Sequence, residues 1–335
     1  MKRRSLLAAP LVLLAPRLAR ATPEPATSPA LNAVLDRAAS LAPLRTVHVA
    51  QGGETVAARA YNGARLEAPA NIKSASKSII SALVGIAIDR GVLESVDQTI
   101  APMLAGDLPT DPDPRLGEIT IGHLLSMQAG LERTSGGNYG RWVSSRNWVR
   151  AALDRPFVTD PGGSMLYSTG STHLLSAILT RRAGRSTLDL ARDWLGPVEG
   201  FAITAWTRDP QGIPIGGNEM AMRPSSLLAF GELYRRGGRT AGGRRILPPA
   251  WVEASWVPRT ASRFTGDAYG YGWFLRVIAG TPVRYAWGYG GQMLYVAPDR
   301  GVTIAMTSAT DVPAGRTGHR DALHRLSGDI LAALA

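Results

Sequence analysis

The 335-residue sequence contains no cysteine. Disulfide bonds, thiolate nucleophiles and thiolate metal sites are therefore excluded. The five histidines lack the His-Glu-x-x-His spacing of a zinc-binding helix. Without disulfides, stability must come from a large core, and the chain is long enough to bury one. We therefore expect a chemistry that needs neither a cysteine nor a metal.

Lysine is nearly as scarce as cysteine. The 37 basic residues are 34 arginines and three lysines, and one of these, Lys2, lies in the N-terminal segment. The other two, Lys73 and Lys77, stand on either side of Ser74. Arginine keeps its proton in proteins, whereas a lysine removed from water can act as a neutral base. The placement favours a chemical role for these lysines, although two residues can also fall together by chance.

The N-terminal apolar run is too short to cross a bilayer, which needs about 20 residues. Basic residues 2–4 precede this run at 5–15, and a small-x-small site follows at 19–21. This order is typical of a secretory signal peptide, here residues 1–21, and its paired arginines also permit the twin-arginine route. We therefore expect an exported protein, periplasmic or secreted, whose mature chain is 22–335 and has no stable membrane insertion.

A concentrated basic surface is also missing. The formal net charge is +11, and removal of the five basic residues of the signal peptide lowers it to +6. The densest basic cluster, 235–245, is interleaved with glycines and predicts a solvated loop. We expect no nucleic-acid partner, because such a partner needs positive charge gathered on one face. Nothing in the sequence indicates an oligomeric state.

Hydrophobic periodicity divides the mature chain into three parts. The first, about 28–95, contains an amphipathic helix, a β-hairpin and a strongly apolar helix. The second, about 96–244, contains helices joined by glycine- and proline-rich loops. The third, about 245–335, contains short strands and a terminal helix. The predicted helices cover 29–42, 74–90, 120–127, 142–153, 171–182, 187–194, 224–235 and 319–334, and the strands 46–50, 55–60, 272–278, 283–287, 292–296 and 302–307. This order predicts an α/β fold in which N- and C-terminal helices flank an antiparallel sheet and a helical subdomain is inserted.

Ser74 and Lys77 form a Ser-x-x-Lys motif at the start of the apolar helix. Residues three apart share a helix face, so the Lys77 amine can reach the Ser74 hydroxyl. The helix N-terminus favours negative charge near Ser74, and burial lowers the pKa of a lysine. Lys73 would lower it further if it pointed inward. The pair therefore predicts a serine nucleophile activated by a neutral lysine base.

Two further segments can carry chemistry. Tyr167 lies on a loop that enters a helix, where a tyrosine can move protons if a cation lowers its pKa; an ordinary core tyrosine is the alternative. Glycines interrupt the strand pattern over 287–292, which marks close backbone approach or a simple hairpin. Because a strand edge can donate N–H groups to an oxyanion, we expect the backbone of Ser74 and Gln292 to form that site.

Together these segments resemble the serine β-lactamase and penicillin-binding-protein superfamily. The similar branch is the class C-type group, which includes esterases, D-amino-acid peptidases and 6-aminohexanoate-dimer hydrolases. The resemblance implies a β-lactamase-like fold and a serine hydrolase without cofactors, and 167–175 is particularly similar to the 6-aminohexanoate hydrolases. Five landmarks in the family's order carry it: 74–77, 119–131, 167–169, 230–248 and 288–298.

Two positions depart from the family's pattern. Thr169 stands where the family has asparagine, and Tyr289 where β-lactamases and peptidases have lysine or histidine. The resemblance implies that both positions, with Gly290 and Gly291, contact the substrate. The amide that would hold a carbonyl and the cation that would hold a carboxylate are therefore missing. This disfavours β-lactam hydrolysis and leaves ester or amide hydrolysis open.

Three functions remain open on the sequence. The favoured one is an acyl-enzyme hydrolase of a small ester or amide, with Ser74 as nucleophile and Lys77 and Tyr167 as general base and acid. The alternatives are a catalytically inactive module that binds peptidoglycan or peptides, and a penicillin-binding D-amino-acid peptidase. Loops 132–147 and 206–222 are expected to line the pocket. His173 is expected to be structural.

Overall fold

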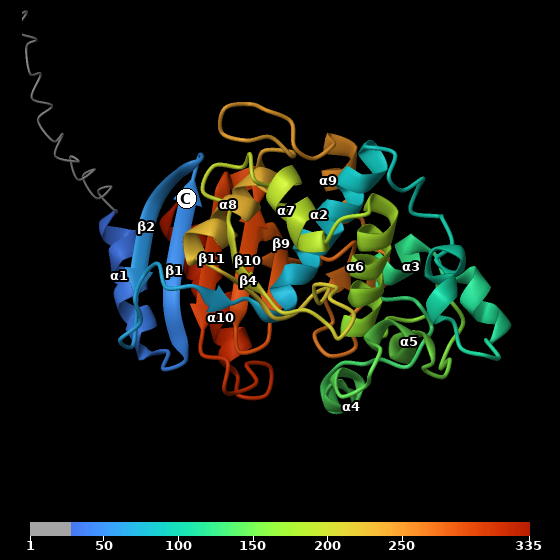
Figure 1. Ribbon diagram of the computed structural model, residues 1–335. Helices are drawn as coiled ribbons and strands as arrows, with labels where there is room; N and C mark the ends of the chain where they lie inside the picture. Colours follow the sequence, from blue (N-terminus) through green and yellow to red (C-terminus); the bar gives the residue numbers. More distant parts are fainter. Residues whose placement is uncertain (1–27) are drawn as a thin grey trace, which may run out of the picture.

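A computed structural model describes residues 28–335, and the predicted signal peptide lies outside them. An antiparallel sheet forms one end of the molecule and a mostly helical part the other (Figure 1). The helices are α1 (Pro29–Arg37), α2 (Ser76–Asp89), α3 (Ile121–Leu125), α4 (Tyr139–Val143), α5 (Trp148–Leu153), α6 (Thr169–Ala183), α7 (Thr187–Trp194), α8 (Pro224–Arg235), α9 (Pro249–Ser255) and α10 (His319–Ala333). The strands are β1 (Leu44–Gln51), β2 (Glu54–Ala60), β3 (Ala70–Asn71), β4 (Ile203–Trp206), β5 (Met220–Met222), β6 (Thr260–Ala261), β7 (Ala268–Tyr269), β8 (Phe274–Ile278), β9 (Thr281–Gly288), β10 (Gln292–Ala297) and β11 (Val302–Ser308). The predicted α/β fold is confirmed.

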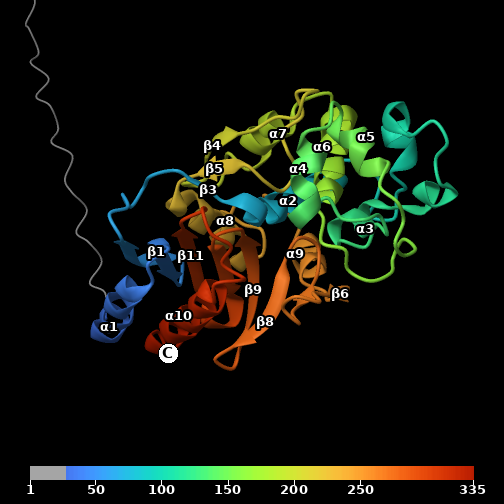
Figure 2. The same cartoon turned by 90° about the horizontal axis from the view of Figure 1, so that it is seen from below.

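The large sheet contains eight strands in the order β2-β1-β11-β10-β9-β8-β7-β6. Because β1 pairs with β11, the N-terminal hairpin lies beside the C-terminal strands (Figure 1). Helices α1 and α10 pack together on one face, as predicted, while α8 and α2 lie on the other (Figure 2). The terminal helices bury the apolar residues Leu31, Leu35, Leu323 and Ile330 in one cluster with strand side chains.

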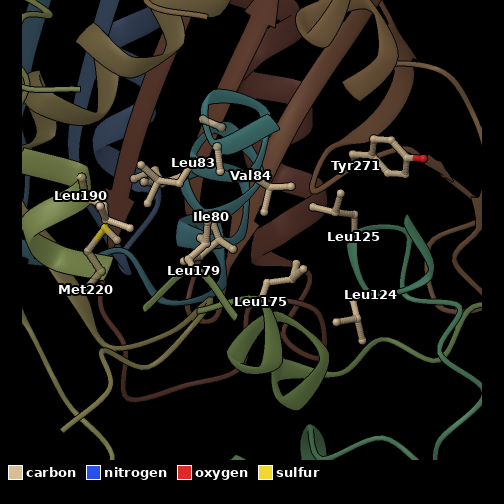
Figure 3. Close-up of a cluster of buried hydrophobic side chains, with 14 of the residues drawn as sticks. Ile80, Leu83, Val84, Leu124, Leu125, Leu175, Leu179, Leu190, Met220 and Tyr271 are labelled. Atoms are coloured by element: carbon tan, nitrogen blue, oxygen red, sulfur yellow. The ribbon is translucent and has the colours of Figure 1, made fainter. Parts of the chain in front are cut away.

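Helix α2 lies between the sheet and the helical part. It contacts β9 on one side and α6 and α7 on the other. Twelve of its fourteen residues are buried, which agrees with its nearly continuous apolar sequence. Figure 3 shows this core, in which α2 contributes Ile80, Leu83 and Val84, surrounded by Leu124, Leu125, Leu175, Leu179, Leu190 and Met220. Helix α2 is therefore held from several sides along its buried length.

The helical part contains a small sheet that the sequence analysis missed. Its strands follow the order β3-β5-β4, and β4 and β5 fall within the segment predicted to be helical. The N–H of Ile72 also bonds the carbonyl of Met220 at 2.9 Å. The small sheet thus fixes the chain two residues before Ser74.

The helix predicted over 142–153 is broken into α4 and α5. The Ser145 hydroxyl donates to the Trp142 carbonyl at 2.7 Å, ending the first helix. The Asn147 side chain accepts the N–H of Arg150 at 3.0 Å and starts the second. Local capping by Ser145 and Asn147 thus outweighs the continuous apolar pattern.

The basic cluster at 235–245 is a solvated loop, as predicted, at the exposed residues Arg239, Arg244 and Arg245, and differs from the prediction at its first two residues. Arg235 ends helix α8, and its guanidinium lies 2.7 Å from the buried carboxylate of Glu232. Arg236 lies 3.3 Å from the same carboxylate. One carboxylate thus binds both guanidinium groups and ties this end of the cluster to the fold. Over residues 28–335, no helix is both long and apolar enough to span a membrane.

Candidate active site

Ser74 lies in a 3-10 turn, Lys73–Ala75, that leads directly into α2. Lys73 has φ 51°, a left-handed conformation that is uncommon for a residue with a side chain. Two hydrogen bonds hold it: its N–H donates to the Asn71 side chain at 3.0 Å, and its carbonyl accepts the Ser76 hydroxyl at 2.7 Å. Ser74 itself is only partly buried. The turn therefore presents the Ser74 hydroxyl at the accessible end of a buried helix.

The Lys73 side chain forms an ion pair with Glu219, and Lys73 is not among the causes of the lowered pKa of Lys77. Its ammonium lies 2.7 Å from a carboxylate oxygen of Glu219, whose other oxygen accepts from the Asn71 amide at 2.5 Å. Lys73 finds a carboxylate here because the loop before β5 lies beside β3. It therefore fixes the turn that carries Ser74, and burial alone lowers the pKa of Lys77.

Lys77 is almost entirely buried, with 2% of its surface exposed. Its Nζ atom lies 3.0 Å from Ser74 Oγ, 2.7 Å from the Gly217 carbonyl and 3.3 Å from Thr169 Oγ1. None of these partners is charged, and burial lowers the pKa of Lys77 to about 7. A neutral amine has two N–H groups and one lone pair. If Gly217 and Thr169 accept the two hydrogens, the lone pair is left for the Ser74 hydroxyl.

Tyr167 lies beside this pair. Its ring stacks on Phe274 at a centroid distance of 6.0 Å, and Lys77 Nζ lies 5.1 Å from its centroid. Burial raises the pKa of Tyr167, and hydrogen bonding to Ser74 opposes the increase without cancelling it. The sequence analysis considered a pKa lowered by a neighbouring cation. A neutral Lys77 supplies little positive charge, so burial prevails and Tyr167 stays protonated.

The N-terminus of α6 places Thr169 against Lys77. The N–H groups of Thr169 and Gly170 donate to the hydroxyls of Ser135 and Thr134 at 2.9 and 2.7 Å. Hydroxyls from a distant segment therefore satisfy the first donors of this helix. Thr169 is 3% exposed, and its hydroxyl also bonds Ser135 at 3.0 Å. Its side chain thus contacts Lys77, while its predicted contact with substrate stays a prediction.

The hairpin between β9 and β10 reaches the turn that carries Ser74 through Gly288. A Cβ atom on Gly288 would lie 2.2 Å from the Ile72 carbonyl, so only glycine fits there. Tyr289, at the turn, is 48% exposed. Gly290 and Gly291 have φ of 84° and 107°, and they pack against Ala309 and His319. The close approach indicated by the glycine pattern therefore occurs at Gly288, which the sequence analysis did not single out.

Gln292 follows this turn and is entirely buried. It pairs with Gly288 in the β9–β10 ladder. Its side-chain amide donates to the Ser308 carbonyl at 2.6 Å and its side-chain oxygen accepts the Ser308 N–H at 3.2 Å. The side chain therefore joins β10 to β11. The predicted role of its backbone N–H as an oxyanion donor stays a prediction.

His173 has no exposed surface and lies one helical turn beyond Thr169. Its Nε2 lies 3.0 Å from Asp209 Oδ2, and its Nδ1 accepts the N–H of Gly216 at 3.3 Å. The next residue, Gly217, is the one whose carbonyl holds Lys77. His173 is thus buried in structural contacts, in line with the expectation, and it anchors the loop that contacts Lys77.

The sequence analysis did not identify two residues that hold the site, one bonded to Thr169 and one bonded to Lys77. Ser135 and Gly217 lie in loops 132–147 and 206–222, which were expected to line the pocket. Neither loop carries a periodic pattern, so the sequence indicates the segments without identifying the residues.

The comparisons with known proteins agree with this architecture. The β-lactamase family model matches residues 38–328. No curated protein sequence matches the chain. Among solved structures, a candidate 6-aminohexanoate-dimer hydrolase from Bacillus anthracis has a TM-score of 0.72 at 18% identity, covering 88% of this chain and 81% of its own.

Two further structures are similar over nearly their whole length. EstCE1, described as a hydrolase with promiscuous acyltransferase activity, has a TM-score of 0.71 at 19% identity, covering 91% of this chain and 97% of its own. A D-stereospecific amidohydrolase from Streptomyces sp. has a TM-score of 0.68 at 15% identity, covering 90% and 97%. At these identities the likeness shows the fold alone. The family match, which spans most of the chain, shows that this protein belongs to the β-lactamase family, whose members are serine hydrolases.

Proposed function

We propose that the protein is an exported serine hydrolase that cleaves a small ester or amide through an acyl-enzyme on Ser74. One observation carries the proposal: Lys77 Nζ lies 3.0 Å from Ser74 Oγ, and burial lowers the pKa of Lys77 to about 7. An amine with this pKa is substantially unprotonated at neutral pH, as a general base must be.

Acylation begins when Ser74 Oγ attacks the substrate carbonyl and its proton moves to Lys77 Nζ. The backbone N–H of Ser74 and a second one from the β9–β10 hairpin, with Gln292 the predicted donor, stabilise the oxyanion. Each such donor contributes about 3 kcal/mol in serine hydrolases. The carbonyl–leaving-group bond then breaks, Tyr167 gives its proton to the departing atom, and Lys77 restores the proton of Tyr167. The raised pKa of Tyr167 supports this role, because the phenol stays protonated until it is needed.

Deacylation uses the same pair in reverse. A water molecule gives its proton to the Lys77–Tyr167 pair and attacks the acyl carbon, and Ser74 leaves with the proton returned to its oxygen. Lys77 and Tyr167 share the transferred proton, so the two groups titrate as a coupled unit. The described partners of Lys77 are neutral, so no nearby carboxylate keeps the amine protonated.

Both ester and amide substrates are supported by the similar structures, among which are a hydrolase with acyltransferase activity and an amidohydrolase. Thr169 and Tyr289 count against β-lactam hydrolysis, since neither supplies the amide or the cation that the family uses. The same substitutions motivated the inactive binding module as an alternative. The buried lysine beside a partly accessible serine favours the hydrolase.

The proposed nucleophile can be tested by covalent labelling. We expect a fluorophosphonate to label Ser74, and p-nitrophenyl acetate and butyrate to give burst kinetics, because an acyl-enzyme accumulates in this mechanism. Ser74→Ala should abolish both. Ser40→Ala is the control, since the exposed Ser40 hydroxyl bonds the Arg37 carbonyl next to α1 and its loss should leave labelling intact. Equal slow turnover by wild type and Ser74→Ala would refute esterase chemistry at Ser74.

We also propose export, on the basis of the signal peptide predicted over 1–21. When the full chain is expressed with a bacterial export system, the periplasmic or secreted fraction should hold a protein that begins at Thr22. N-terminal sequencing and intact mass measure this directly. Replacing both Arg3 and Arg4 by lysine should block export if the twin-arginine route is used, and leave it intact if the general secretory route is used. Recovery of only the uncleaved chain in the cytoplasm would contradict the proposal.

A further inference from the structure

A cavity of about 220 Å³ opens beside Tyr167. Tyr167 therefore borders both the Ser74–Lys77 pair and this cavity. Met165 and Leu166, which precede Tyr167, also line it, and the rest of the lining comes from two loops that are distant in sequence, one at Arg133 and one over 262–264. Because the proposed general acid forms part of its wall, the cavity lies where a substrate group attached to the departing atom can extend.

The cavity is lined by two arginines and by no acidic residue. In the described part of the chain, neither Arg133 nor Arg263 forms an ion pair. The side-chain contacts found for them are weak or uncharged: Arg133 lies over the Phe264 ring at 5.1 Å, and Arg263 donates to the Ser164 hydroxyl at 3.5 Å. Both guanidinium groups keep donors for another partner.

The acidic residues nearest in sequence to Arg133 and Arg263 form ion pairs with other arginines. Glu132 is next to Arg133 in sequence, yet it pairs with Arg155. Asp267 is four residues beyond Arg263, yet it pairs with Arg276 at 3.3 Å. The two nearest acidic side chains in sequence are therefore committed elsewhere, and the positive charge beside the cavity stays uncompensated.

The apolar part of the lining suits an organic group. Met165 is buried, whereas Phe264 is 69% exposed although it is a large hydrophobic residue. A phenylalanine held open to solvent under an arginine offers a flat apolar surface next to a cation. The cavity thus combines an apolar wall with two free guanidinium groups.

We propose that this cavity binds a carboxylate carried by the leaving group of the substrate, with Arg133 and Arg263 as its ligands. A guanidinium fork matches a carboxylate in geometry and charge. Tyr289 occupies the position that would supply such a cation in related β-lactamases. Arg133 and Arg263 bind the carboxylate in its place, from a different part of the site. This inference rests on the proposed hydrolase, because Tyr167 as general acid defines the leaving-group side.

The test compares two esters that differ only in charge, 4-acetoxybenzoate and methyl 4-acetoxybenzoate. The measured quantity is the ratio of their kcat/KM values in each variant relative to wild type, which cancels their intrinsic reactivities. We expect Arg133→Gln and Arg263→Gln each to lower the preference for the acid about tenfold, the lower end of the range for charged hydrogen bonds. Arg37→Gln, at the exposed end of α1, is the matched control and should leave the ratio unchanged.

Failure of the proposed hydrolase function and failure of the proposed carboxylate site give different results. If the proposed function fails, neither ester is turned over in a way that depends on Ser74. If only this inference fails, Ser74-dependent turnover persists with one ratio in all variants. A preference for an anionic acyl group, measured with p-nitrophenyl hydrogen glutarate against p-nitrophenyl butyrate and lost in the arginine variants, would overturn the leaving-group assignment.

Binding supplies a readout that needs no turnover. Calorimetric titration of the Ser74→Ala protein should show 4-acetoxybenzoate binding about tenfold more tightly than its methyl ester. The difference should shrink on addition of Arg133→Gln and also at high salt, because partly exposed charges are screened. Equal affinity for the acid and the methyl ester would overturn the proposal.

Discussion

Replacement of Lys77 by methionine is expected to lower kcat/KM for p-nitrophenyl butyrate by about 10³-fold or more, the upper range for loss of a general base. Methionine has a similar length and fits the apolar surroundings of α2, so the loss would reflect the missing amine and not an altered fold. Stopped-flow measurement of the burst separates acylation from deacylation. Both rates should fall, since Lys77 serves both steps.

Lys73→Met is the matched control, because these are the two lysines of the described chain. It removes the ion pair with Glu219 and leaves the 3.0 Å contact between Lys77 and Ser74 in place. The expected loss is less than about tenfold, in line with a partly exposed pair. Similar losses in the two variants would show that Lys77 acts by holding the turn, not by taking a proton.

The same Lys77→Met variant should be more stable than wild type, with a defined pH dependence. The folded-state pKa of Lys77 is about 7, well below its ordinary value of 10.5, so the folded protein binds fewer protons than the unfolded chain between these values. Wild-type stability therefore rises with pH across this window, and the penalty of burying Lys77 is greatest below pH 7. Methionine removes that penalty, and we expect a gain of about 2–4 kcal/mol at pH 6 after the loss of the hydrogen bond to Gly217.

Urea unfolding at pH 6 and pH 10 measures this difference. The gain should be large at pH 6 and small at pH 10, because most of the pH range between the folded and unfolded pKa values of Lys77 lies below pH 10. An equal gain at both pH values would mean that Lys77 is not neutralised by burial. Loss of stability at both would mean that its hydrogen bonds outweigh desolvation.

The second large effect is expected for Gly217→Ala. Gly217 has φ 74°, and a Cβ atom there would lie 2.5 Å from Cγ and 3.1 Å from Nζ of Lys77. The added methyl group must displace the lysine side chain, which has no space to retreat because it is buried. We expect kcat to fall about 10²-fold, a typical result of shifting a catalytic group by about 1 Å.

Gly212→Ala is a matched control in the same loop. Gly212 has φ 82°, and no atom lies within 4 Å of the position of its Cβ. Both substitutions force alanine into the left-handed region at a cost of about 1 kcal/mol, whereas only the first touches Lys77. The two variants therefore share this backbone cost, and the larger loss of stability and of kcat expected for Gly217→Ala comes from the contact with Lys77. Equal kcat values would contradict the assignment of Gly217 as the residue that positions the base.

Local signals predicted part of the fold with accurate boundaries. Helices α7 and α8 begin and end at the predicted residues, because Ser186 caps the first and a proline begins the second. The strands β3, β4 and β5 were missed because each has two to four residues, too short for a period of two to be visible. Pairing with distant partners, not local propensity, creates them.

The site shows the same difference between contacts set by local spacing and contacts made by distant segments. Ser74 and Lys77 were predictable because one helical turn brings i and i+3 together. The orientation of Lys73 was not, because it depends on Glu219, which lies 146 positions away in the chain. Ser135 and Gly217 hold Thr169 and Lys77 from separate loops, and no local pattern records such contacts.

The sequence by itself determined the layered α/β fold, the serine–lysine pair and the absence of thiol chemistry, since these follow from residue identity and short-range spacing. Only the tertiary structure decided that Lys77 is buried among neutral partners, that burial raises the pKa of Tyr167, and that Arg133 and Arg263 share one cavity. The physical reason is that desolvation and charge compensation depend on everything that surrounds a group in space. Chain neighbours are a small part of those surroundings.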